Sequence, residues 1–160
     1  MLWAVFPRAL RYRKNCSKNE GRTSLDMMSS YLFDSHALLA FFQKEKGAEA
    51  VARILRKARK QQLDRLICII NLGEIIYMTK KRFGDNKKLE VLGRVGQLGF
   101  KVLPASDPLV YKAAELKAEY PISYADCFAL ACAQDHSATL VTGDPEFKKV
   151  ASLVKIHWIR

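Results

Sequence analysis

From Ser30 onwards, short apolar strand patterns alternate with amphipathic helix patterns, and this alternation restricts the fold more than any other feature of the sequence. The predicted strands cover residues 31–33, 65–70, 100–103, 138–142 and 154–159. Helix patterns occupy residues 35–46, 48–62, 72–83, 86–98, 107–120, 123–136 and 145–152. Strands that alternate with helices pair in parallel, and helices then cover both faces of the sheet. The sequence therefore predicts a single α/β domain over residues 29–160.

The first 28 residues differ from the rest of the chain. They carry Arg8, Arg11, Arg13, Lys14, Lys18 and Arg22 against Glu20 and Asp26, without sustained periodicity. Met27 and Met28 stand just before the first predicted strand. We expect residues 1–28 to be a disordered extension or an artefact of an upstream start site, with an Arg-rich transit peptide as the alternative. A native protein whose mass includes Met1 would exclude the start-site explanation.

The charge of the chain favours a polyanionic partner. Lys and Arg number 27 against 16 Asp and Glu, a formal net charge of +11. Basic side chains gain from counterion release when they neutralise phosphates, so RNA or DNA is the favoured class of partner. No apolar run reaches the roughly 20 residues that a membrane-spanning helix needs, and we expect no membrane association. The four cysteines form no C-x-x-C pair, which favours free thiols in a reducing cytoplasm.

Acidic residues follow the predicted strands at the edge where open parallel sheets bind ligands. Asp34 directly follows the first strand, and Asp144 lies two residues beyond the fourth. Glu74 falls in the first turns of the helix after the second strand, in a window with no basic residue within four positions. Asp34 and Asp126 also lack a lysine or arginine within four positions. Unpaired carboxylates at the border of a core are costly unless a cation or hydrogen bonds compensate them.

Each aspartate also has an ordinary structural explanation. Asp34 and Asp144 could be helix N-caps, and Asp126 stands three residues after Ser123, close to a capping box. Asp107 is followed by proline, as Asp144 is, with no catalytic implication. Helix capping and catalysis therefore both stay open for each aspartate taken singly.

A convergent set of carboxylates would favour a hard divalent cation. Several carboxylates aimed at one point repel each other, and oxygen ligands select Mg²⁺ or Mn²⁺ over Zn²⁺. Such an ion can orient a phosphodiester and help to generate a hydroxide nucleophile. Ser35, Asn71 and Thr142 neighbour the acids and could hold water or phosphate, although helix capping explains them equally well.

Four segments of the sequence resemble the PIN-domain nucleases, and most closely the VapC toxins of bacterial toxin–antitoxin pairs. These segments are Tyr31–Leu38, Asn71–Glu74, Ser123–Cys127 and Thr142–Phe147, and the resemblance covers about residues 29–160. It implies a PIN-like three-layer sandwich with a central, mostly parallel sheet of about five strands and helices on both faces. His36 departs from the small residue of many relatives, and the extension of residues 1–28 is also unusual.

The resemblance implies a function as well as a fold. It implies that Asp34, Glu74, Asp126 and Asp144 form a catalytic Mg²⁺ site, with Mn²⁺ as a possible substitute. The implied activity is an endoribonuclease that hydrolyses RNA and leaves a 5′-phosphate and a 3′-hydroxyl. For the toxin branch, the resemblance further implies a homodimer and a cognate antitoxin.

Basic side chains that could contact RNA lie on two helices. Lys80, Lys81 and Arg82 extend the helix of Glu74 and could steer an RNA backbone, or could suit the C-terminus of that helix electrostatically. The basic face of residues 53–60 is more simply a solvated face. Apolar residues of the helix 35–46 exceed what one face needs, which suggests a dimer or antitoxin interface.

Two alternatives to a toxin stay open at this point. One is a stand-alone RNA-processing nuclease, and the other is a catalytically silent domain that binds RNA or a partner protein. The glycine-rich patterns of dinucleotide-binding and P-loop proteins are absent from the sequence.

Overall fold

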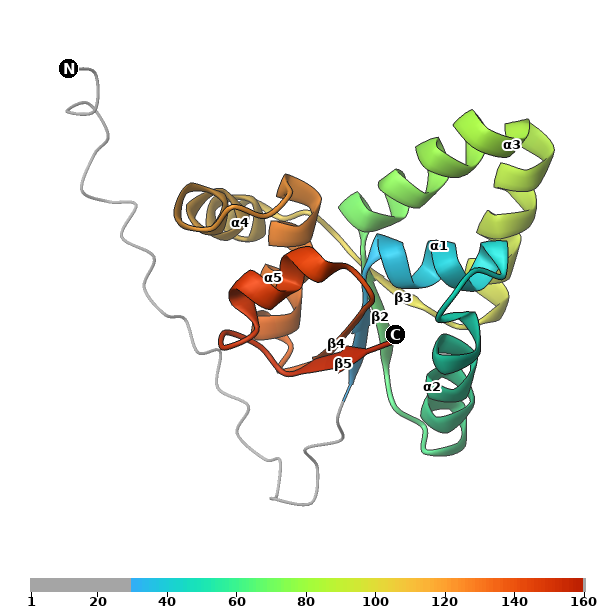
Figure 1. Ribbon diagram of the computed structural model, residues 1–160, viewed down its shortest axis with the longest axis horizontal. Helices are drawn as coiled ribbons and strands as arrows, with labels where there is room; N and C mark the ends of the chain where they lie inside the picture. Colours follow the sequence, from blue (N-terminus) through green and yellow to red (C-terminus); the bar gives the residue numbers. More distant parts are fainter. Residues whose placement is uncertain (1–29, 160) are drawn as a thin grey trace.

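A five-stranded, fully parallel sheet forms the centre of the molecule in the computed structural model, which describes residues 30–159 (Figure 1). The strands are β1 (Tyr31–Phe33), β2 (Arg65–Cys68), β3 (Lys101–Leu103), β4 (Thr139–Thr142) and β5 (Ile156–Trp158). Their order across the sheet is β3-β2-β1-β4-β5. Every neighbouring pair is parallel. The predicted α/β class and strand number are confirmed.

Helices cover both faces of this sheet, as a three-layer sandwich requires. They are α1 (Ser35–Gln43), α2 (Ala48–Lys60), α3 (Ile69–Gln97), α4 (Asp107–Glu119), α5 (Tyr124–Asp135) and the short 3-10 helix η2 (Pro145–Val150). In Figure 1, α1, α2 and α3 lie on one side of the strands, and α4 and α5 lie on the other. The interpretation of residues 1–28 as an extension or start-site artefact concerns residues outside the described part of the chain.

Two hydrophobic cores lie between the three layers, one on each face of the sheet. Successive side chains of a strand point to opposite faces, so Phe33 packs with α1, α2 and α3 while Leu32 packs with α4 and α5. Phe147 of η2 is fully buried in the second core. The central strands β1, β2 and β4 are almost entirely buried, which explains why they are short continuous apolar runs in the sequence, whereas the edge strands β3 and β5 are largely exposed.

Helix α1 does not offer the apolar interface that its sequence suggested. Leu38, Leu39 and Phe42 are at most 8% exposed, and Phe41 packs against the same core. These side chains are buried because α2 and α3, as well as the sheet, cover α1. The suggestion that some of these side chains form a dimer or antitoxin interface was wrong for Leu38, Leu39 and Phe42, whereas Phe41 is only partly buried.

Several boundaries differ from the sequence-based ones for identifiable reasons. Helix α1 ends at Gln43 because Lys44 adopts a left-handed conformation with φ of 57°. The second strand stops at Cys68, and α3 begins at once with Ile69. Gly84, with φ of 81°, divides α3 into the two predicted helices, and Figure 1 shows the sharp bend between them.

Gly47 joins α1 to α2 in a place that admits no side chain. Its φ is +96°, and a Cβ atom there would lie 2.9 Å from the carbonyl oxygen of Ile159. We expect Gly47→Ala to lower the free energy of unfolding by about 1–3 kcal/mol, through backbone strain and overpacking. Urea unfolding would measure the change.

Gly93 provides the matched control for this substitution. It is helical, and a Cβ atom there would meet nothing within 4 Å. Gly93→Ala should raise stability by about 0.5–1 kcal/mol, because alanine loses less backbone entropy in a helix. Equal effects of the two substitutions would contradict the packing described for Gly47.

Among residues 30–159, no helix combines the length and the apolar character that crossing a bilayer requires. Cys68, Cys127 and Cys132 are buried free thiols.

Candidate metal centre

Four acidic side chains come from separate segments to the carboxyl edge of the sheet. Asp34 caps the N-terminus of α1 directly after β1, and Glu74 lies in the second turn of α3 after β2. Asp144 follows β4 and caps η2. Asp126 reaches the same edge because α5 precedes β4 and runs antiparallel to it, so the first turn of α5 lies beside the strand ends.

A pocket of about 260 Å³ opens among these segments. Its lining residues are Ser35, His36, Leu39, Glu74, Met78, Ser123, Asp126, Asp144 and Glu146. Asp34 lies beneath this lining and is only 1% exposed. Three of the four predicted acids therefore line the pocket, and the fourth is buried below them.

Asp34 links the first helix to the end of β4. Its Oδ1 accepts a hydrogen bond from the backbone N–H of Ala37 at 2.7 Å, the N-cap interaction that the sequence left open. Its Oδ2 accepts from the Thr142 hydroxyl, and Thr142 Oγ1 accepts from the backbone N–H of Asp144 at 2.9 Å. Thr142 thus connects the segments that carry Asp34 and Asp144.

Ser35 and Asn71 hold Glu74 and fix two helices together. The Ser35 hydroxyl donates to Glu74 Oε2. Asn71 Nδ2 donates to Ser35 Oγ at 3.3 Å and to the carbonyl oxygen of Ala125 at 3.1 Å, which ties α3 to α5. Asn71 Oδ1 is buried and has no hydrogen-bond partner among residues 30–159. An orphaned buried acceptor beside the acids is a further oxygen atom available to water or a cation.

Asp126 is the third residue of α5, and it forms hydrogen bonds with Ser123, the N-cap residue of that helix. The Ser123 hydroxyl donates to Asp126 Oδ2 at 2.7 Å and accepts from the Asp126 backbone N–H at 3.1 Å. Glu146 Oε2 accepts from the Ser123 backbone N–H at 3.0 Å. Glu146 lines the pocket and was not among the predicted site residues, although its position two residues after Asp144 could have indicated it.

The four carboxylates share one strongly acidic environment. Within residues 30–159, no lysine or arginine forms an ion pair with any of them. Burial raises the pKa of Asp34 to about 8, and the charges of Asp126 and Asp144 add to the rise. Burial also raises the pKa of Asp126 to about 6, with contributions from Asp144, Glu74 and Glu146. Mutual repulsion and desolvation therefore oppose full ionisation of the set.

The donor chemistry of the pocket fits Mg²⁺ or Mn²⁺. Apart from the His36 imidazole, its polar lining is carboxylate and hydroxyl oxygen, the ligand type that hard divalent cations prefer. However, no three acidic, histidine or cysteine side chains of the described residues stand in a ready-made cage for a metal ion. Instead, Asp34, Glu74 and Asp126 each accept a hydrogen bond from a neighbouring hydroxyl group. A cation would have to compete with those hydroxyl groups for the carboxylate oxygens, and its positive charge favours its binding there.

The basic residues of α3 lie outside the acidic pocket. Lys80 Nζ pairs with Asp85 at 3.2 Å, and Arg82 pairs with Glu45 at 2.9 Å. Lys81 is exposed on the same helix. Their suggested contact with RNA stays a prediction.

Fold and site together define a parallel α/β domain with an acidic pocket at the carboxyl edge of its sheet. The chain belongs to the PIN domain family, whose family model matches residues 31–153. A search of curated protein sequences finds no significant match.

Several solved structures with the same fold are toxins or toxin–antitoxin complexes of bacteria. VapBC2 of Rickettsia felis, bound to a DNA fragment from its promoter, matches with a TM-score of 0.67 and 19% identity over 79% of this chain and 96% of that chain. DNA-bound VapBC of Salmonella typhimurium matches with a TM-score of 0.64 and 17% identity, over 83% of this chain and 100% of that chain. VapC20 of Mycobacterium tuberculosis, a toxin that cleaves the sarcin-ricin loop, matches with a TM-score of 0.61 and 13% identity, over 77% and 95% of the two chains. These similarities show the fold.

Proposed function

We propose that this protein is a cytoplasmic, Mg²⁺-dependent endoribonuclease and the toxin of a VapBC-type pair. The observation that carries the proposal is the gathering of Asp34, Glu74, Asp126 and Asp144 at one pocket, with no cationic side chain of the described residues paired to them. Buried acids without counter-charge are costly to stability, and such arrangements are typical of functional sites.

The roles of the side chains follow from their positions. Glu74, Asp126 and Asp144 would hold the ion from the pocket wall, and Asp34 would support it from below. A bound Mg²⁺ or Mn²⁺ supplies a Lewis acid that orients the phosphodiester and lowers the pKa of a water molecule. The hydroxyl groups of Ser35 and Thr142 orient the carboxylates of Glu74 and Asp34. The net charge of +11 attracts RNA to the surface.

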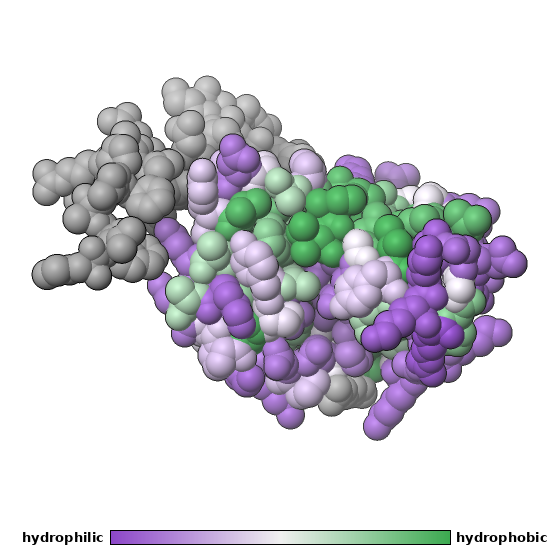
Figure 2. Space-filling view, turned by 90° about the horizontal axis from the view of Figure 1, so that it is seen from above, coloured by the Kyte–Doolittle hydropathy of each residue, from purple (hydrophilic) through white to green (hydrophobic). Residues whose placement is uncertain are grey.

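The comparisons support the substrate and the partner. One structural relative is described as a toxin that cleaves an RNA loop, and others are complexes of toxin with antitoxin. The face in Figure 2 carries a broad apolar area bordered by hydrophilic side chains, as expected of a protein that binds an antitoxin or a second copy of itself.

Metal-dependent cleavage of RNA is the direct test of this function. We expect purified protein to cut a structured RNA internally when Mg²⁺ or Mn²⁺ is present, and to stop when EDTA removes the metal. The products should carry a 5′-phosphate, which a phosphate-dependent exonuclease detects. Cleavage that continues unchanged in EDTA, or products with a 2′,3′-cyclic phosphate, would contradict metal-activated hydrolysis.

A further inference from the structure

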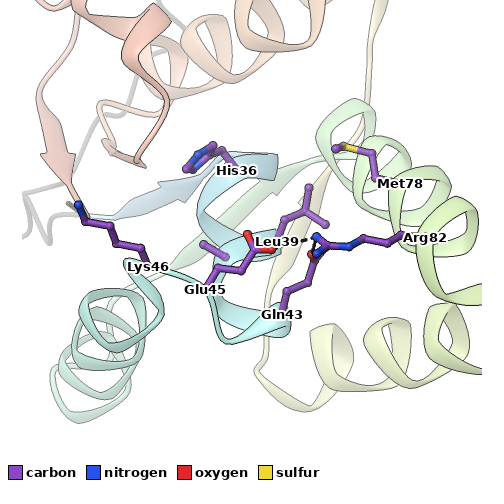
Figure 3. A pocket seen from close by; sticks show the side chains of 8 residues that line it. His36, Leu39, Gln43, Glu45, Lys46, Met78 and Arg82 are labelled. Atoms are coloured by element: carbon purple, nitrogen blue, oxygen red, sulfur yellow. Dashed lines mark hydrogen bonds and ion pairs between the residues drawn. The ribbon is translucent and has the colours of Figure 1, made fainter.

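A second and larger cavity lies beside the acidic pocket. It measures about 520 Å³ and lies between α1, the turn after α1, and α3 (Figure 3). His36, Leu39 and Met78 line both this cavity and the acidic pocket, so the two hollows are adjacent and share a wall. A ligand whose reacting group lies among the acids would extend directly into this cavity.

His36 lies at that shared wall, and its imidazole ring fits there because Gly143 has no side chain. A Cβ atom on Gly143 would lie 2.8 Å from His36 Cε1 and 2.9 Å from His36 Nδ1. The imidazole therefore packs directly on the backbone between Thr142 and Asp144. Its Nδ1 is buried, with no hydrogen-bond partner in the part of the chain that the structure describes. Because Nδ1 and Cε1 face Gly143, the opposite edge of the ring is the one left for a ligand.

The far end of the cavity is polar. Arg82 donates hydrogen bonds to Gln43 Oε1 at 2.5 Å and to Glu45 Oε1 at 2.9 Å, and Figure 3 shows the three side chains together. Gln43 and Glu45 each keep a second polar atom, one a donor and the other an acceptor. Leu39 and Met78 supply apolar surface between this end and His36.

We propose that this cavity is a subsite for a nucleobase of single-stranded RNA, next to the bond that is cleaved, and that His36 helps to select the base. The inference rests on the proposed ribonuclease function. A cavity with an apolar middle, an aromatic ring at one end and a mixed donor and acceptor end suits an unstacked base, which presents flat apolar faces and a hydrogen-bonding edge. Its volume lies within the usual range of small-ligand sites.

Binding measured without metal tests the subsite independently of catalysis. The probes are short fluorescent homopolymers of adenosine, cytidine or uridine ribonucleotides, and the readout is anisotropy in EDTA. We expect the wild type to bind the best homopolymer about tenfold more tightly than the worst, and His36→Ala to lose most of this discrimination. Gln43→Ala, a second variant at the polar end of the cavity, should change the order of preference.

His136→Ala is the matched control, because His136 is exposed at the C-terminus of α5, at the opposite edge of the sheet. It should discriminate as the wild type does. Equal discrimination by wild type, His36→Ala and Gln43→Ala would overturn the subsite. Discrimination by the wild type without Mg²⁺-dependent cleavage would overturn the proposed nuclease and leave the subsite standing.

Discussion

Replacement of Asp144 by asparagine is expected to reduce Mg²⁺-dependent RNA cleavage by more than about 100-fold, since even residues that only support metal ligands cost 10–100-fold when they are replaced. Asparagine can still cap η2, because its side-chain oxygen can accept the 2.8 Å hydrogen bond from the Glu146 backbone N–H. The loss would therefore come from the missing charge in the pocket and not from unfolding. Initial cleavage rates at saturating Mg²⁺ would measure it.

Asp107 offers a control in the same local sequence. It also precedes a proline at a helix start, but it is exposed at the beginning of α4 and does not line the pocket. Asp107→Asn should leave cleavage within about twofold of the wild type, as surface substitutions usually do. If the two asparagine variants behaved alike, Asp144 would be a helix cap and nothing more.

Replacement of Asp34 by asparagine should abolish cleavage and at the same time stabilise the metal-free protein at alkaline pH. Burial raises the pKa of this carboxyl group from 3.8 to about 8. Between these values the unfolded chain has released the proton while the folded protein keeps it, so stability falls as the pH rises through this window. Asparagine is never charged, so the variant avoids the cost of a buried charge at this position, which is on the order of a few kcal/mol.

Urea unfolding in EDTA, at about pH 4 and about pH 9, would measure this difference. Wild type and Asp34→Asn should have similar stability at the lower pH, and the variant should be the more stable at the higher pH. Mg²⁺ should restore stability to the wild type there. A variant that is less stable than the wild type at both pH values would show that Asp34 serves folding.

The fold could be predicted because its pattern is local. Each strand is a short apolar run, and each helix carries its own amphipathic period and end signals. The ends of the helices and strands were harder to predict, because tertiary contacts determine where an element stops. Lys44 adopts a left-handed conformation that could not be predicted from a lysine at this position. The additional apolar residues of α1 are buried because α2 and α3 enclose that helix.

Part of the candidate site could be predicted for a similar reason. The carboxyl ends of parallel strands must share an edge, so the positions of Asp34, Glu74 and Asp144 follow from the strand order. The partners of each acid could not be predicted, because hydrogen bonds such as Thr142 to Asp34 join residues 108 apart in the chain. Glu146 was not predicted, because its place in the pocket depends on tertiary contacts such as the hydrogen bond that its Oε2 accepts from the Ser123 backbone N–H, 23 residues away in the chain.

Crystals of the protein soaked in Mn²⁺, with anomalous diffraction recorded to locate the ion, would test most directly whether the crowded acids exist to bind a cation. The expected result is one or two peaks in the pocket, about 2.0–2.2 Å from carboxylate oxygens of Glu74, Asp126 or Asp144. A pocket that stays empty of Mn²⁺, while its acids keep only their hydroxyl partners, would contradict the metal centre and the nuclease built on it.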